Sequence, residues 1–184
     1  MEYLDICDEQ GFPTGKIVER AEAHRLGIRH RTAHVWVVRY AEGRLQVLLQ
    51  RRSLTKDSFP GRLDTSSAGH IPAGSEPLPS ALRELEEELG IRAEADDLQY
   101  IGWFDNKYKR EFYGKTFQDN EHSSVYVCRK SVNISALHLQ KEELEEVVWK
   151  DFEETYAACR RRDPAYCVPI RSLEALSSAI PITM

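Results

Sequence analysis

Residues 69–91 read GHIPAGSEPLPSALRELEEELGI, a glycine-bounded loop followed by a segment with helical periodicity. On a helix that turns about 100° per residue, three leucines share one face and three carboxylates share the opposite face: Leu82, Leu85 and Leu89 against Glu84, Glu87 and Glu88. Side chains three and four positions apart are neighbours on a helix, so these carboxylates converge and repel one another unless something compensates their charge. Gly90 predicts the end of this helix in a left-handed conformation.

Two interpretations fit this acidic face. Mg²⁺ is typically held by a few carboxylates together with substrate phosphates, which indicates a metal site. The alternative is the solvated face of an ordinary amphipathic helix, which charge alone favours.

The spacing of the stretch resembles the Nudix box. In that pattern a glycine and a glutamate precede an Arg-Glu pair, an aliphatic residue, a Glu-Glu pair, a second glycine and a second aliphatic residue. Eight of the nine specified positions match: Gly69, Arg83, Glu84, Leu85, Glu87, Glu88, Gly90 and Ile91. Ser75 stands where the first glutamate of the box belongs, and Glu76 follows it. A match of this length favours the metal site.

Composition sets the bounds of the prediction. The 184 residues suit one domain, 1–184, with a sizeable core. The net charge of −5 gives no basic footprint for nucleic acid. Since no apolar run is long enough to span a membrane and residues 1–5 have no signal-peptide character, we expect a cytoplasmic protein without a membrane partner. The four cysteines show no metal spacing and are expected to be free thiols: Cys7, Cys128, Cys159 and Cys167.

Hydrophobic patterns predict strands at 3–7, 16–18, 33–40, 45–50, 98–104, 123–128 and 147–149. Further helices are expected at 19–26 with Gly27 ending it, at 151–161 with Asp151 as the N-cap, and at 172–179. Residues 51–68 are expected to form a loop and residues 105–120 a polar excursion. One α/β domain with a mixed sheet between helices is the simplest architecture.

The resemblance extends beyond the box, to the Nudix branch related to isopentenyl diphosphate isomerase. The matching segments are DEQG at 8–11, AHR at 23–25, HRTAHVW at 30–36, QRRS at 50–53 and DNE at 119–121. It implies a Nudix-like α/β/α sandwich with a central mixed sheet. It also implies hydrolysis of a nucleoside diphosphate linked to another moiety, by attack of water on phosphorus.

In such an enzyme the resemblance implies that Glu84, Glu87 and Glu88 hold Mg²⁺, or Mn²⁺, together with the backbone carbonyl of Gly69. Metal ions neutralise the diphosphate and acidify the attacking water. Arg83 lies four residues before Glu87 and is expected to orient its carboxylate through a charge-assisted hydrogen bond. Loss of the glutamate at Ser75 is expected to weaken the metal site unless Glu76 replaces it.

Outside the box, Glu121 is the leading metal ligand or catalytic base, since it precedes a predicted strand where related proteins carry a metal-binding glutamate. Glu142 and Glu143 are rivals for the base, although a solvated charge run explains them better. Arg51, Arg52 and Lys56 are placed to bind phosphates. Because side chains alternate on a strand, one of the two adjacent arginines is expected to face solvent.

A different reaction, isomerisation of isopentenyl diphosphate, is the main alternative. The isomerase binds a metal with three histidines and two acids, which match His24, His30 and His70 with Asp119 and Glu121, and its catalytic cysteine matches Ala68. Alanine cannot transfer a proton, so hydrolysis is favoured and the histidines form a candidate second metal site. A non-catalytic nucleotide binder is the third interpretation, supported only by Ser75.

The predicted partner is a small phosphorylated molecule, and a homodimer is expected by resemblance. Three aromatic residues in the 105–117 segment either stack on a base or simply pack: Tyr108, Phe112 and Tyr113. Packing is the more common role of aromatic residues in such a segment.

Overall fold

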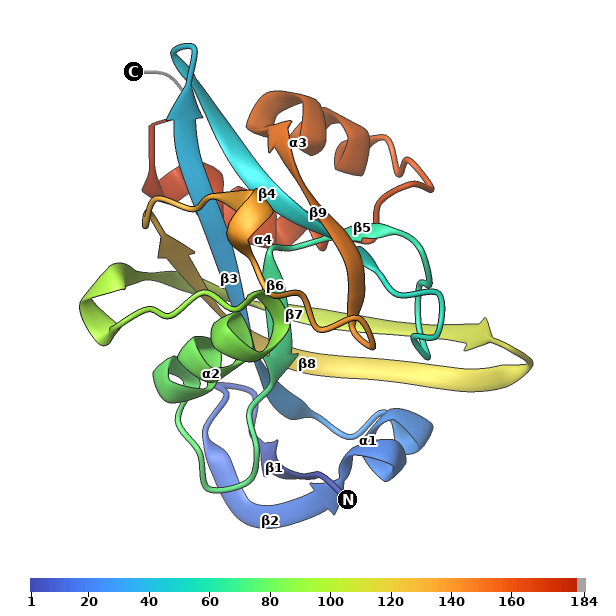
Figure 1. The fold of residues 1–184 in the computed structure, drawn as a ribbon. Helices are drawn as coiled ribbons and strands as arrows, with labels where there is room; N and C mark the ends of the chain where they lie inside the picture. Colours follow the sequence, from blue (N-terminus) through green and yellow to red (C-terminus); the bar gives the residue numbers. More distant parts are fainter. Residues whose placement is uncertain (182–184) are drawn as a thin grey trace.

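A mixed β-sheet forms the centre of the computed structural model, which describes residues 1–181 (Figure 1). Seven strands take part: β3 (His30–Ala41), β4 (Arg44–Arg52), β5 (Leu63–Asp64), β6 (Ser67–His70), β7 (Leu98–Phe112), β8 (Lys115–Cys128) and β9 (Leu144–Asp151). Their order is β5-β4-β3-β8-β7, with β6 paired to β3 and β9 paired to β4. β3 and β8 run parallel, whereas the other pairs run antiparallel. β1 (Tyr3–Cys7) and β2 (Pro13–Glu19) form a separate antiparallel pair.

Helices cover both faces of the sheet. The side chains of β3 alternate: Trp36 and Val38 belong to one buried cluster, and Val35 and Val37 belong to the other. The first cluster includes residues of α3 (Phe152–Arg160) and α4 (Ile170–Ala179), and the second includes residues of α2 (Pro77–Leu89). A strand buried on both faces is typical of such a sandwich. The predicted α/β/α sandwich is therefore confirmed.

The ends of the helices follow the sequence signals. α1 (Arg20–Leu26) ends at Gly27 with φ 68°, and α2 ends at Gly90 with φ 70°. Glycine reaches this left-handed region without steric cost, so it closes both helices. The Asp151 carboxylate accepts a hydrogen bond from the Glu154 backbone N–H at 3.0 Å and caps α3 as predicted. Short 3₁₀ turns occur at Ala95–Asp97 and Ile134–Ala136.

Two expectations about loops are wrong. The segment 105–120 is not an excursion, because β7 and β8 continue through it as one long hairpin paired from Leu98↔Cys128 to Phe112↔Lys115. Backbone pairing needs no buried face, so polar residues extend the hairpin beyond the hydrophobic pattern. The 51–68 segment contains β5 and β6, and β6 places Gly69 and His70 at the edge of the sheet.

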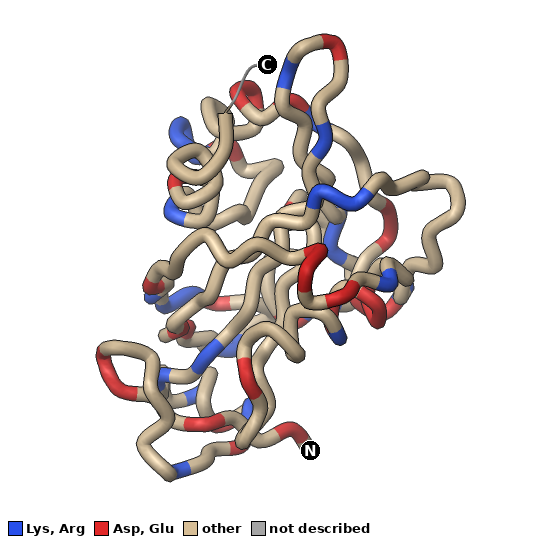
Figure 2. Tube along the Cα trace, turned by 90° about the vertical axis from the view of Figure 1, so that its left-hand side faces the viewer, with Lys and Arg blue, Asp and Glu red and all other residues tan. Residues whose placement is uncertain are grey.

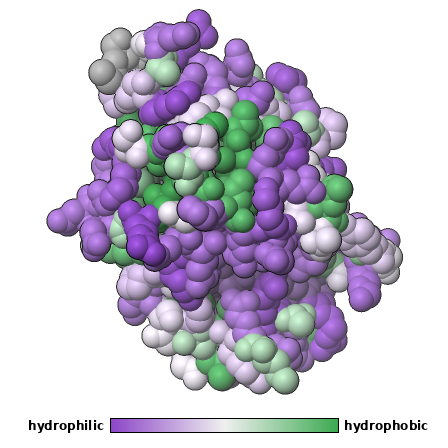
Figure 3. Space-filling model, in the orientation of Figure 1, coloured by the Kyte–Doolittle hydropathy of each residue, from purple (hydrophilic) through white to green (hydrophobic). Residues whose placement is uncertain are grey.

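Charged residues and hydrophobic residues are distributed differently over the molecule (Figure 2 and Figure 3). Lys and Arg segments are interspersed with Asp and Glu segments along the trace in Figure 2. On the face shown in Figure 3, hydrophobic side chains gather in the upper half and hydrophilic ones cover the centre. In the described part of the chain no helix is both long and apolar enough to cross a membrane.

Candidate functional site

A polar cavity of about 640 Å³ lies where α2, β6, β8 and the segment after β4 meet. Residues from widely separated parts of the sequence line it. Most of the predicted site residues are among them: His24, Arg52, Lys56, Gly69, His70, Arg83, Glu84, Glu87, Glu88 and Glu121. His30 lies next to the lining residues His24 and His70 but does not line the cavity itself. Arg51 does not line it either. The fold thus brings the box helix, the histidines and two of the three predicted cations to one place.

The three box carboxylates differ in exposure. Leu85 and Leu89 are fully buried against the sheet, which turns the acidic face of α2 towards the cavity. Glu88 is buried and accepts a hydrogen bond from the Ala68 backbone N–H at 3.3 Å. Burial raises the pKa of Glu88 to about 8, and the neighbouring Glu84 adds to the shift. Burial also raises the pKa of Glu84, against the opposing effect of Arg83. A buried carboxylate group of this kind favours a cation as partner.

Arg83 organises this face of the helix. Its guanidinium donates to the Glu84 carboxylate and to the His70 carbonyl oxygen, the latter at 3.3 Å, and lies 3.6 Å from a Glu87 oxygen. Arg83 lies beside Glu87 as expected, but the hydrogen bond predicted for Glu87 is made to Glu84 instead. A Cβ added at Gly69 would stand 2.2 Å from the Glu84 carboxyl carbon. Glycine at position 69 therefore makes room for the Glu84 carboxylate.

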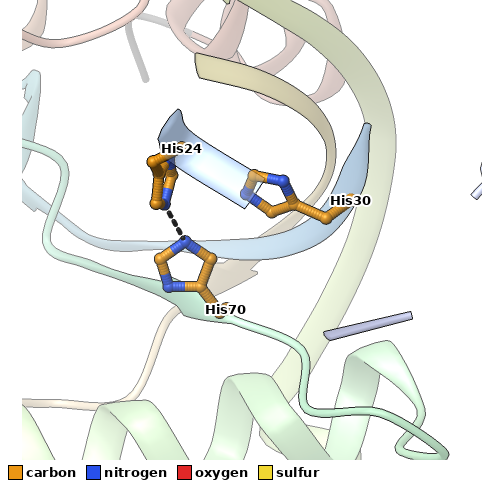
Figure 4. A group of neighbouring side chains, drawn as sticks. All are labelled: His24, His30 and His70. Atoms are coloured by element: carbon orange, nitrogen blue, oxygen red, sulfur yellow. Dashed lines mark hydrogen bonds between the residues drawn. The ribbon is translucent and has the colours of Figure 1, made fainter. Parts of the chain in front are cut away.

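Three histidine side chains point towards one another beside the box (Figure 4). His24 comes from α1, His30 from the start of β3 and His70 from the end of β6. The Nε2 atoms of His24 and His70 are 3.1 Å apart, and the ring centroids of His24 and His30 are 4.9 Å apart. Such close imidazoles cannot all be protonated without strong repulsion.

Two carboxylates of β8 complete the cluster. Asp119 Oδ1 lies 3.5 Å from His24 Nδ1, and Glu121 Oε1 lies 3.7 Å from His30 Nε2 and 3.8 Å from His70 Nε2. The register His30↔Glu121 between the parallel strands β3 and β8 sets this proximity. Ligand atoms lie within 4.8 Å of one another in two overlapping groups, His24–His30–His70 and His30–Asp119–Glu121.

The protonation and hydrogen bonding of the cluster fit a metal ion. Burial and the nearby His30 lower the pKa of His24 to about 4, and burial lowers the pKa of His70 well below its usual value. Neutral imidazoles are the form that binds metals. His30 Nε2 and Asp119 Oδ1 are buried without a hydrogen-bond partner in the structure. Buried polar atoms without partners are rare in proteins, and a metal ion would satisfy both.

Glu121 belongs to this histidine cluster. Burial opposes ionisation of Glu121, yet the imidazoles of His30 and His70, whose Nε2 atoms lie 3.7 Å and 3.8 Å from its Oε1, keep its pKa below the ordinary value. Within the described residues, neither compact ligand group includes a carboxylate of α2. Among the described residues, the structure therefore groups Glu121 with the histidines and does not bring the α2 carboxylates together into a compact ligand group.

The predicted phosphate-binding cations already have acidic partners. Arg52 donates to Asp64 at 3.1 Å, and Lys56 donates to Glu143. Arg51 forms its 2.6 Å ion pair with Glu146 away from the cavity, so the expectation that one of the adjacent arginines faces outward agrees with the structure. Glu143 lines the cavity, whereas Glu142 is exposed and does not.

Several lining residues were not singled out from the sequence, namely Glu2, Arg20, Asp64 and Cys167. Cys167 reaches the cavity because the chain beside it pairs with β5. Tyr166 forms a bridge with Leu63, and the Cys167 backbone N–H donates to the Leu63 carbonyl at 2.9 Å. Burial raises the pKa of this thiol well above its usual value. Apart from Asp64, which lies shortly before Gly69, these positions are far from the box in the sequence, and no local signal marks them.

Ser75, which occupies the box position of a glutamate, is held by a hydrogen bond to its backbone. The Ser75 carbonyl oxygen accepts a hydrogen bond from the buried Arg31 guanidinium at 2.9 Å. Neither Ser75 nor Glu76 is among the residues that line the cavity. Glu76 instead is the N-cap residue of α2.

The model of the NUDIX domain matches residues 28–168. The chain belongs to the NUDIX domain family. Nudix hydrolase 3 of Arabidopsis thaliana is 42% identical over 167 residues, which are 90% of this chain and 21% of the plant protein. The chain thus spans about a fifth of that relative. An uncharacterized Nudix hydrolase of Clostridium acetobutylicum is 37% identical over 154 residues, 83% of this chain and 71% of the bacterial protein. The predicted enzyme class, a Nudix pyrophosphohydrolase, is confirmed at this level.

Solved structures support the same fold. A crystal structure from Deinococcus radiodurans superimposes with a TM-score of 0.69 at 20% identity, covering 98% of this chain and 100% of that chain. The NUDIX domain of Shewanella oneidensis NrtR, solved in complex with ADP ribose, gives a TM-score of 0.58 at 16% identity and covers 88% of this chain and 97% of that chain. These likenesses establish the Nudix fold.

Proposed function

We propose that the chain is a divalent-metal-dependent hydrolase that cleaves the diphosphate linkage of a nucleoside diphosphate derivative. One observation carries the proposal: the carboxylates of α2, the histidine–acid cluster and two cations line a single cavity of about 640 Å³. A diphosphate has dense negative charge, and this cavity offers ligands for the cations that offset such charge.

The first metal position is assigned to Glu84, Glu87 and Glu88 with the Gly69 carbonyl. Oxygen ligands suit Mg²⁺, and Mn²⁺ is the expected substitute. Mg²⁺ bound here would neutralise the substrate phosphates and lower the pKa of the attacking water. Arg83 holds Glu84 and approaches Glu87, so its role is to fix the orientation of the ligands.

The second metal position is assigned to His24, His30 and His70 with Asp119 and Glu121. The partnerless His30 Nε2 and Asp119 Oδ1 support this assignment. Mixed imidazole and carboxylate ligands suit Mn²⁺ or another transition metal better than Mg²⁺. This cluster also supports placement on the branch that resembles isopentenyl diphosphate isomerase.

Lys56 and Arg52 are assigned to the substrate phosphates. When substrate enters, Lys56 would leave Glu143, and Arg52 would leave Asp64, to bind phosphate oxygens. The exchange at Lys56 would free Glu143, which lies near Glu88. Glu143 and Glu121 are the two candidates outside α2 to accept the proton of the attacking water. We also propose that the substrate is a small phosphorylated molecule, that the chain forms a homodimer and that it acts in the cytoplasm.

The isomerase alternative draws on the same histidine–acid cluster. It is disfavoured because Ala68, in β6, has no transferable proton. A non-catalytic nucleotide binder is disfavoured because Glu84, Glu87 and Glu88 all line the cavity.

A substrate panel separates these functions. Nucleoside diphosphate derivatives, ADP-ribose first because the Shewanella NUDIX domain holds it, are incubated with Mg²⁺ or Mn²⁺ in ¹⁸O-labelled water. Hydrolysis at phosphorus places ¹⁸O in a phosphate product, which mass spectrometry detects. Conversion of isopentenyl diphosphate to its allylic isomer, seen by proton NMR, would establish the isomerase instead. Tight binding of these nucleotides without any product would favour the binder.

A further inference from the structure

A second cavity of about 820 Å³ lies beside the polar cavity, between α1 and the far end of the β7–β8 hairpin. The two cavities share five lining residues: Glu2, Arg20, His24, Asp57 and Phe117. A molecule held at the metal ligands therefore has a direct path into the second space.

The two spaces differ in chemistry. Carboxylates, histidines and cations line the first cavity. Charged side chains also line the second, but the surface that the second exposes is mostly carbon. Its aromatic wall consists of Phe112, Tyr113 and Phe117 from the hairpin. One face of Phe117 already stacks on His24, with 4.3 Å between ring centroids, so Phe112 and Tyr113 provide the aromatic surface that a ligand can reach. Aromatic rings of this kind stack on bases or pack against other apolar groups.

Tyr113 occupies its position at a conformational cost. It has φ 51° and is followed by Gly114 with φ 73° at the turn between β7 and β8. Turns with two positive φ angles favour Asn-Gly or Gly-Gly, and a bulky residue at the first position is uncommon. The ring is 67% exposed and so gains little from burial that would offset this cost. A ligand contact is a physical reason for an aromatic residue at this turn.

The end of the hairpin is held in place before any ligand arrives. The Tyr113 hydroxyl donates to the Leu54 carbonyl at 3.0 Å. Phe59 packs edge-on against Phe112 with 4.9 Å between centroids, and against Tyr108 at 5.6 Å. The 53–62 segment and the hairpin thus form one pre-organised wall, which reduces the entropic cost of binding.

Arg20 stands at the junction of the two cavities. Its guanidinium lies 3.4 Å from Asp57 and 3.6 Å from Glu2, and its side chain is 34% exposed. Longer, partly exposed ion pairs contribute little, so Arg20 can turn towards a phosphate at low cost. Arg20 lines both cavities, as does His24 of the histidine cluster.

We propose that the second cavity binds the apolar, planar part of the substrate while its diphosphate lies in the first cavity, with Arg20 contacting the phosphate between them. This inference rests on the proposed function and deepens it, because it assigns the substrate to diphosphates that carry a large flat organic group. Two sources share this chemistry, a nucleobase and a non-nucleotide aromatic group.

Isothermal titration with Ca²⁺ in place of Mg²⁺ measures binding while suppressing turnover. The probes are ADP-ribose, 1-naphthyl diphosphate and inorganic diphosphate. Tyr113→Asn removes the ring but keeps a residue suited to positive φ, so the turn is retained. Loss of one stacking contact is expected to weaken binding of the organic probes about ten-fold and to leave inorganic diphosphate unchanged. Weakening confined to ADP-ribose identifies a base, and weakening confined to the naphthyl probe identifies a non-nucleotide group.

Two control variants isolate the ring. Tyr113→Phe keeps the aromatic surface but loses the bond to Leu54, and it is expected to bind the organic probes more tightly than Tyr113→Asn does. Tyr100→Asn removes another exposed aromatic side chain, one that lines neither cavity, and is expected to have no effect. Equal binding of all three probes by the wild type and Tyr113→Asn would overturn the inference. Failure of the proposed hydrolysis gives a different result, namely organic probes that bind but are not turned over with Mg²⁺.

Discussion

The Asp5 carboxylate and the Arg31 guanidinium form a buried ion pair with 2.9 Å between Oδ2 and Nη2. The same carboxylate oxygen accepts the Gly74 backbone N–H at 2.9 Å, and Arg31 Nη2 donates to the Ser75 carbonyl at 2.9 Å. The pair thus ties β1 and β3 to the loop that enters α2. It supports this loop from outside the box, at the position where Ser75 replaces the expected glutamate.

Asp5→Leu is expected to destabilise the protein and to weaken metal binding at α2. Removing one partner leaves the Arg31 charge buried, which lowers the free energy of unfolding by about 3 kcal/mol. Urea unfolding followed by circular dichroism measures this loss. The matched control is Glu86→Leu, which breaks the exposed Glu86–Arg92 pair on α2 and should cost less than about 1 kcal/mol. Equal losses in the two variants would contradict a supporting role for Asp5.

Glu87→Gln tests the role of the box carboxylates. The substitution keeps the size of the side chain and removes a ligand charge, so Mg²⁺-dependent turnover should fall by at least about ten-fold. Glu86→Gln is the control, because Glu86 is adjacent on α2 but pairs with Arg92 and does not line the cavity. A phosphatase-coupled assay across a range of Mg²⁺ concentrations compares the two. Unchanged activity in Glu87→Gln would remove Glu87 from the metal site.

Local sequence signals predicted the elements whose burial leaves a periodic pattern. The leucines of α2, the glycines at 27 and 90 and the cap at Asp151 each act over a few residues, and each has the predicted role. The long hairpin escaped prediction because Lys107–Gln118 is mostly polar and is held by backbone pairing with its partner strand. A hydrophobic pattern cannot report a strand that has little buried side-chain surface.

The site residues also divide into those that a local sequence signal predicts and those that only tertiary contacts bring to the site. The box residues and the histidines were found from their sequence context, and the fold brings them to one cavity. Arg20 and Cys167 were missed because their proximity to the site depends on tertiary contacts, with Glu2 and Asp57 for Arg20 and with Leu63 for Cys167. The acidic partners of Lys56 and Arg52 were also missed, although they determine whether these cations are free for phosphate.

The histidine–acid cluster should hold its own metal ion. Co²⁺ bound by imidazole nitrogens gives visible absorption bands that depend on its ligands, so titration of the apo-protein should reveal this site directly. His24→Gln is expected to abolish those bands and to lower Mn²⁺ affinity by about 10–100-fold. His138→Gln serves as the control, since His138 packs against Gly90 at the end of α2 and not against the cluster. Unaltered bands in His24→Gln would assign the metal elsewhere.

Removal of metal gives a second measure of the same site. A ligand that binds only the folded state stabilises it by mass action, about 2.7 kcal/mol at one hundred times its Kd. Mn²⁺ should therefore raise the Tm of the wild type, and EDTA should reverse the shift. The shift should be smaller in His24→Gln and in Glu87→Gln if both ligand sets are occupied. A Tm that does not respond to Mn²⁺ in the wild type would argue against both positions.

Gly69→Ala should disrupt the box without unfolding the protein. The added Cβ would meet the Glu84 carboxyl group at 2.2 Å, and this group is the movable end of a side chain, so Glu84 must swing away while the backbone stays in place. Metal affinity should fall by about ten-fold with little change in Tm. A double-mutant cycle makes the test specific. In a Glu84→Gln background, where the ligand is already impaired, Gly69→Ala should have a much smaller effect. Additive losses would show that Gly69 acts on the cavity by another route than Glu84.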